Sequence, residues 1–184
     1  MLFRSLGNGW VHHLTLSLRY GVGLPLLMLG LAGAVAREDC VGTISSVDLR
    51  RHHPDLMRQT GLSRDKAAIE RANLVALDRE IRAAKEIAGG RGLIAVNVMR
   101  AVSQYAAYVR QACESGADAI VVGTGLPFDL PELTADYPEV ALVPILSEAR
   151  AIGLVLKKWQ RKGRLPDAIV IEHPGYAGGH LGAA

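Results

Sequence analysis

The residues best suited to chemistry lie in the segment 168–184 of this 184-residue sequence, AIVIEHPGYAGGHLGAA. The apolar run Ala168–Glu172 predicts a buried strand, and a glycine-rich turn with one histidine, His180, follows it. Glycine lets the backbone approach a ligand closely and present its N–H groups, which suits a phosphate or the edge of a flavin ring. An imidazole that faces such a ligand can move a proton. The competing interpretation is a frayed chain end, because termini are commonly poorly ordered.

Short apolar runs alternate with amphipathic helical stretches along most of the chain, and this alternation decides the fold class. Continuously apolar strands are typical of strands buried on both faces, and intervening helices indicate right-handed parallel crossovers. The sequence therefore predicts an α/β fold. The predicted strands are Val41–Val47, Leu93–Met99, Ala119–Gly123, Val140–Leu146 and Ala168–Glu172. The predicted helices are Pro54–Thr60, a long helix capped by Ser63 that runs to about Ile87 and stops at Gly89, Ser103–Ser115, and Glu148–Lys162.

Two architectures fit this order of elements, an open doubly wound sheet and a (β/α) barrel. Both place function beyond the carboxyl ends of the strands. The residues to inspect are therefore the same in either case. They are Ser45, Ser46, Asn97, Gly123–Gly125, Ser147, and Glu172 with the residues after it.

Composition excludes some classes of partner. The 21 basic and 18 acidic residues leave a formal charge of only +3, so we expect no nucleic-acid partner. The densest basic cluster, Arg50–His53, is interpreted as a solvated loop. We expect no metal site, because adjacent histidines such as His52 and His53 point to opposite faces of a strand. Cys40 and Cys113 are interpreted as buried thiols in a reducing compartment, which indicates a cytoplasmic protein.

The apolar stretch Leu24–Ala36 has two interpretations. Two preceding arginines and the Ala-Val-Ala at residues 34–36 are compatible with a secretory signal. A membrane span is not expected, because it needs about 20 apolar residues. We favour a buried strand, turn and helix at the start of a barrel, because the stretch continues directly into the strand that begins at Val41.

The segment Tyr176–Gly182, YAGGHLG, resembles the A-G-G-H-x-G motif of nitronate monooxygenases, formerly called 2-nitropropane dioxygenases. This resemblance implies an FMN-binding (β/α)8 barrel of the TIM type. It implies that Gly178 and Gly179 contact FMN and that His180 is the catalytic base. It also implies flavin contacts for Asn97, which matches an asparagine of the family's third strand, and for Glu172, with His173 as the alternative to Glu172.

The resemblance extends from Leu31 to the end of the sequence, and Leu31–Ser46 and Gly123–Leu133 match in the same order. Residues 1–30 depart from the family, whose opening strand carries a Gly-Gly-Met segment. We therefore interpret 1–30 as a divergent N-terminal segment and 31–184 as a partial barrel with about six of the eight strands. Its two open edges predict aggregation, association with another chain (a second copy among the candidates), or poor order at Val41–Val47 and near the C-terminus.

The activity that the resemblance implies is oxidation of alkyl nitronates by O₂, which gives a carbonyl compound and nitrite. The small-molecule partners would be the nitronate and O₂, and FMN would carry the electrons. One alternative is a flavin-dependent, NADH-linked enoyl-thioester reductase of the same superfamily. The other is a barrel fragment without catalysis.

Overall fold

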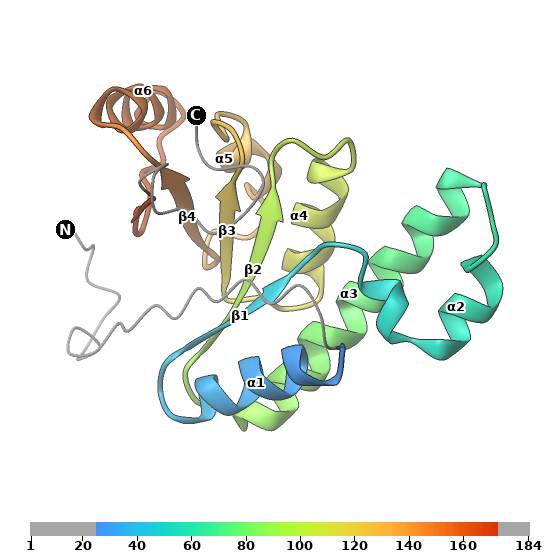
Figure 1. The fold of residues 1–184 in the computed structure, drawn as a ribbon. Helices are drawn as coiled ribbons and strands as arrows, with labels where there is room; N and C mark the ends of the chain where they lie inside the picture. Colours follow the sequence, from blue (N-terminus) through green and yellow to red (C-terminus); the bar gives the residue numbers. More distant parts are fainter. Residues whose placement is uncertain (1–24, 173–184) are drawn as a thin grey trace.

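The computed structural model describes residues 25–172 and the side chains from residue 30 onward. Five parallel strands form one curled sheet in the order of the chain, β1-β2-β3-β4-β5 (Figure 1). The strands are β1 (Val41–Ser45), β2 (Leu93–Met99), β3 (Ala119–Gly123), β4 (Ala141–Leu146) and β5 (Val170–Ile171). The helices are α1 (Pro25–Arg37), η1 (Leu49–His52), α2 (Pro54–Thr60), α3 (Lys66–Ala88), α4 (Tyr105–Glu114), α5 (Leu130–Leu133) and α6 (Ala149–Gln160). The predicted α/β class is confirmed, and the curled sheet is a half-barrel.

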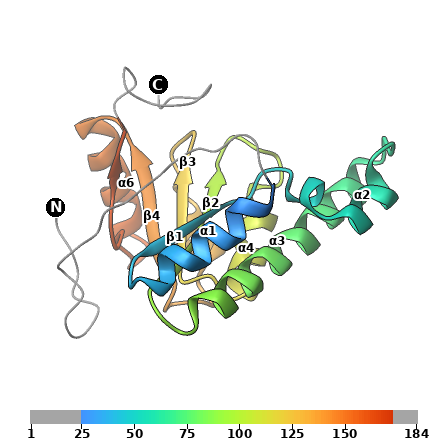
Figure 2. The same cartoon turned by 60° about the horizontal axis from the view of Figure 1, so that its bottom comes forward.

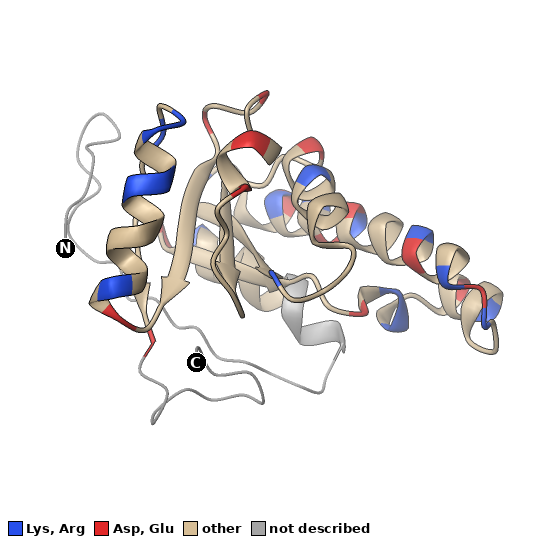
Figure 3. Cartoon of the chain, turned by 90° about the horizontal axis from the view of Figure 1, so that it is seen from above, with Lys and Arg blue, Asp and Glu red and all other residues tan. Residues whose placement is uncertain are grey.

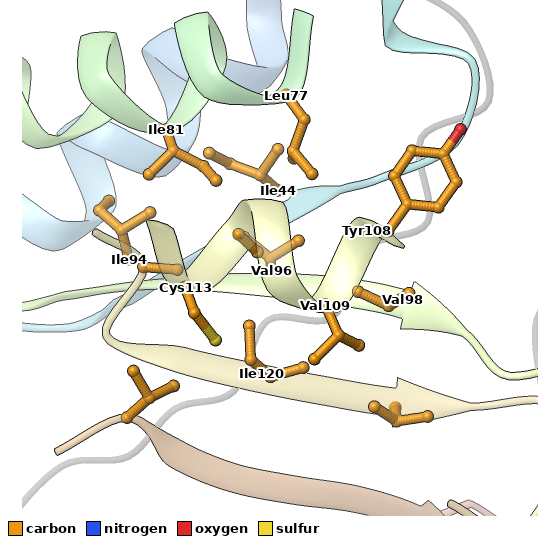
Figure 4. Packing of buried hydrophobic residues seen from close by; sticks show 14 of the residues in the cluster. Ile44, Leu77, Ile81, Ile94, Val96, Val98, Tyr108, Val109, Cys113 and Ile120 are labelled. Carbon is orange, nitrogen blue, oxygen red and sulfur yellow. The ribbon is translucent and has the colours of Figure 1, made fainter. Parts of the chain in front are cut away.

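The main hydrophobic core lies between the convex face of the sheet and the helices. Strand side chains alternate between the two faces, so Ile44, Val96 and Ile120 all point to this layer. Figure 4 shows them interleaved with side chains from α3 and α4, including Leu77 and Val109. Each of these residues is fully buried, and burial of such a side chain stabilises the fold by about 1.5–3 kcal/mol.

The concave face of the sheet carries a second, smaller cluster. Ala95, Ala119, Val121 and Ile145 are buried there, and half-buried valines and alanines surround them. None of the five strands contains a charged residue, so the charges lie on helices and loops (Figure 3). Small uncharged side chains on this face match the expected interior of a barrel.

Helix α3 begins later than the sequence predicted. Asp65, and not Ser63, is its N-cap, because the Asp65 carboxylate accepts a hydrogen bond from Ala67 N at 2.9 Å. Ser63 lies two residues earlier, where its hydroxyl accepts a hydrogen bond from Asp65 N. The helix ends as predicted at Gly89, which adopts the left-handed conformation common at helix ends.

The opening of the described chain differs from the prediction. Residues 25–37 form helix α1, and no strand lies within them, so the described sheet has five strands where about six were expected. Leu and Ala dominate this segment and favour a helix, and Pro25 at its first position is compatible with a helix start. Helix α1 runs across the predicted boundary at residue 30 and lies beside α3 (Figure 2). Because Gly42 has no side chain, α1 packs directly on β1: a Cβ there would overlap Ala32 O.

The basic cluster at residues 50–53 is not a solvated loop. Arg50 is 7% exposed, and its backbone N–H donates to the Asn73 side chain of α3 at 3.1 Å. Its guanidinium also donates to Thr60 Oγ1 at 3.3 Å. These contacts fix η1 against α3. Cys113 is buried as predicted, whereas Cys40 is only half-buried.

None of the helices in the described part of the chain combines the length and the apolar content needed to cross a bilayer.

Candidate functional site

Asn97 lies on the concave face of the sheet, near the carboxyl end of β2. It is in register with Ser45 of β1 and with Val121 of β3, so the three side chains point to the same side. Asn97 O accepts a hydrogen bond from Ser46 N at 3.0 Å, which extends the pairing beyond the end of β1. The half-buried amide of Asn97 is therefore held on a rigid element, where a (β/α) barrel places its ligands.

Glu172 follows β5 directly, at the same edge of the sheet. Its backbone N–H donates to Leu146 O at 3.0 Å, and its side chain is half-buried. Strands β3 and β4 separate it from β2, so Asn97 and Glu172 share a rim without being neighbours in the sheet. The remaining predicted site residues, Gly178, Gly179 and His180, lie outside the described residues, as does His173.

A polar cluster that sequence reasoning missed follows the carboxyl ends of β2 and β3. The Arg100 guanidinium lies 4.6 Å from the centre of the Tyr105 ring, and its NH2 group is 3.3 Å from Asp129 Oδ2. Cation–π contact and ion pairing thus fix the orientation of the arginine. The sequence places Asp129 in a loop before a short helix, and only the structure shows that it contacts Arg100.

The electrostatics of this cluster are unusual because three of its polar atoms are buried. Arg100 Nε, Tyr105 Oη and Asp129 Oδ1 have no hydrogen-bond partner among the described residues. Burial, and to a smaller extent the charge of Asp129, holds the pKa of Tyr105 well above its usual value. The phenol therefore stays protonated, and a hydrogen-bond acceptor for its O–H would stabilise it.

The loop after β3 carries backbone strain beside this cluster. Thr124 has a φ of 58°, which is strained for a β-branched residue, and Gly125 has a φ of 139°, which glycine adopts without strain. A Cβ at Gly125 would lie 3.2 Å from Arg100 Cγ, so this loop passes close to the arginine side chain. Strained backbone of this kind is common at functional sites, and it supports the carboxyl edge of the sheet as the candidate site.

Comparison with solved structures finds proteins of similar fold whose sequence identity to this chain is low. No protein-family model matches the sequence, and no curated protein matches it either. FabK from Thermotoga maritima is similar in structure, with a TM-score of 0.52 and 17% identity over 84% of this chain and 39% of that chain. A point mutant of the same FabK gives a TM-score of 0.52 and 18% identity over 89% of this chain and 44% of that chain. The chain thus spans less than half the length of these neighbours, and the likeness shows that it shares the fold of FabK over most of its own length.

Proposed function

We propose that the chain is part of an FMN-dependent oxidoreductase barrel. The observation that carries the proposal is the position of Asn97 on the concave face, at the carboxyl end of a strand in a half-barrel. Flavin-binding barrels place the cofactor at that end of the strands. The likeness to FabK, an enoyl-ACP reductase of the TIM-barrel flavoenzyme superfamily, supports the same assignment.

The residues at this edge fit a flavin in chemistry. The Asn97 amide offers two donors and an acceptor, which suit the alternating polar atoms along the edge of an isoalloxazine ring. Ser45 of β1 places a hydroxyl on the same face. Gly123 of β3, the strand on the other side of β2, has no side chain there. Asn97 and Glu172, with Gly178 and Gly179, would hold the FMN. The cofactor, when bound, supplies the electron transfer.

The substrate proposed first is an alkyl nitronate, which O₂ converts to a carbonyl compound and nitrite. His180 would accept a proton or hold the anionic substrate, because imidazole titrates near neutral pH. This assignment depends on the AGGHLG segment of the sequence.

The second candidate is reduction of an enoyl thioester with NADH. The likeness to FabK favours it, since FabK is an enoyl-ACP reductase. Both candidates use the same cofactor and the same edge of the sheet, so they differ only in the substrates that the flavin meets.

The test begins with flavin binding by the full chain. We expect absorbance bands of bound FMN, and we expect Asn97→Ala to weaken FMN binding by about tenfold, which corresponds to ~1.4 kcal/mol for one lost contact. Thr43→Ala is the matched control. Thr43 lies on β1, on the same face of the sheet as Asn97, but farther from the carboxyl ends of the strands. If neither the wild type nor the variants bind FMN added in excess, the chain by itself has no flavin site.

The flavin-loaded protein then separates the two reactions. Oxygen uptake that depends on nitronate supports the first candidate, and oxidation of NADH that depends on an enoyl thioester supports the second. We expect His180→Ala to reduce the nitronate reaction while leaving FMN binding unchanged.

A further inference from the structure

His53 and Glu80 form a buried contact outside the candidate site. His53 lies between η1 and α2, and Glu80 lies on α3. His53 Nε2 is 3.0 Å from Glu80 Oε1, and the two side chains are 17% and 1% exposed. Glu80 Oε2 and His53 Nε2 both lack a hydrogen-bond partner among the described residues, so the 3.0 Å approach is a close contact and not a formed hydrogen bond. A buried carboxyl without a cation is stable only in its neutral form.

The charged groups around this contact do not neutralise Glu80. Arg79 of α3 pairs with Asp55 of α2 through contacts of 2.9 and 3.1 Å. The guanidinium of Arg50, from η1, points to Thr60 and Met57 and pairs with Asp48. His52 is also half-buried, and its Nδ1 has no partner among the described residues.

The surroundings shift the pKa of each side chain in the direction that favours its neutral form. Burial raises the pKa of Glu80 to about 7. Burial also lowers the pKa of His53, and the charges of Arg79 and His52 lower it further, against the opposing effect of Asp55. Between the lowered pKa of His53 and about 7, the two side chains therefore hold one titratable proton between them.

We propose that His53 and Glu80 form a proton-dependent latch that keeps η1 and α2 docked on α3. One shared proton closes the latch. Removal of that proton leaves a buried carboxylate beside a neutral imidazole. Addition of a second proton creates a buried imidazolium next to Arg79. Either change favours undocking, because each leaves a buried charge without a partner.

The direction of the pH dependence follows from linkage. Glu80 has a raised pKa, so its contribution to docking is complete below 4.5, its ordinary value, and is lost as the pH rises through about 7. His53 has a lowered pKa, so its contribution is complete above 6.5 and is lost as the pH falls. Glu80 thus favours docking at low pH and His53 favours it at high pH, and the two effects oppose each other below 6.5.

The latch acts on the candidate site through the chain. Residues 46–48 join the carboxyl end of β1 to η1, and Ser46 N donates to Asn97 O. Undocking of η1 would free this connection at the rim where Asn97 lies. The latch therefore controls one wall of that rim.

Hydrogen exchange of the Arg50 amide in the full chain tests the latch directly, because that amide donates to Asn73 across the docked contact. After correction for intrinsic exchange, we expect the ratio of opening constants, wild type over Glu80→Gln, to rise between pH 5 and 7. The rise is at most about tenfold per pH unit and levels off above the raised pKa. Glu86→Gln, an exposed change on the same helix, serves as control and should open as wild type does at every pH. A wild-type to Glu80→Gln ratio that stays constant from pH 5 to 9 would overturn the proposal.

Two further measurements keep the test independent of any single variant. The ratio of opening constants, wild type over His53→Gln, should rise as the pH falls below 6.5, and a constant ratio would exclude His53 from the latch. Infrared spectra of the wild type should show a buried protonated carboxyl at pH 6 that titrates near 7 and is missing in Glu80→Gln. Absence of that band in the wild type would contradict the shared proton.

Discussion

The two rims of the sheet satisfy their polar groups in opposite ways. At the amino-terminal rim, Asp118 precedes β3 and accepts hydrogen bonds from Ile94 N and from Lys85 Nζ, both at 2.7 Å. Asp167 precedes β5 and does the same for Leu142 N at 2.8 Å and for Arg164. Each carboxylate thus accepts hydrogen bonds both from the backbone near the start of a neighbouring strand and from a cationic side chain.

The segments that follow the carboxyl ends of β1, β2 and β3 are different. Every buried side-chain N or O atom without a hydrogen-bond partner, among the described residues, belongs to these segments or to Glu80, which contacts one of them. Positive φ does not separate the rims, because Asp39 before β1 adopts it as well as Asp48 and Thr124. The contrast therefore rests on the unpaired buried atoms, and an amino-terminal rim built for stability is the division expected of a (β/α) barrel.

The largest effect should come from the amino-terminal rim. Asp118→Ala leaves the Ile94 amide and the Lys85 ammonium without their acceptor, and we expect a loss of about 3 kcal/mol in the free energy of unfolding. Urea denaturation measures it, with Asp136→Ala as an exposed control. A loss below ~1 kcal/mol would show that this rim does not stabilise the sheet as described.

Asp167→Ala should cost somewhat less, about 2 kcal/mol, because β5 is the shortest strand and lies at the edge of the described sheet. The same denaturation measurement applies, with lower protection of the Leu142 amide as a local readout. If Asp167→Ala costs more than Asp118→Ala, the ranking of central over edge strand is wrong.

The smallest change, with the opposite sign, should come from the carboxyl-terminal rim. Tyr105→Phe removes a buried hydroxyl that has no partner among the described residues, so we expect a gain of about 1 kcal/mol or less in stability. Tyr137→Phe is the control and should change little. A clear loss for Tyr105→Phe would mean that the hydroxyl is satisfied in solution, and the contrast between the rims would weaken.

The sheet was predictable because each strand can be recognised from its own residues and those next to it. Each is a short apolar run between turn residues, and the residues that end the helices, such as Gly89, have a local conformational role. The opening helix was not predictable in the same way. The run LPLLMLG is apolar throughout and fits a buried strand as well as a helix, and only its packing on α3 and β1 decides between them.

The candidate site was predictable in part. Asn97 follows from strand position alone, because any polar residue near the end of a buried parallel strand is conspicuous. The contact of Arg100 with Asp129 and that of His53 with Glu80 join residues far apart in sequence. Periodicity cannot reveal them. For the same reason the burial of Arg50 within the basic cluster could not be recognised, since Asn73 on α3 contacts it.

The order of strands in the sheet has a kinetic consequence. Each strand pairs with its predecessor in the chain, but the connection between β1 and β2 is more than twice as long as that between β2 and β3. Closing the longer loop costs only about 1 kcal/mol more in chain entropy, yet it delays the contact. We therefore expect β2, β3 and β4 to assemble first and the β1 segment, with η1 and α2, to join last. A segment that joins last is also a natural unit of partial unfolding, so it can open while the rest of the sheet stays folded.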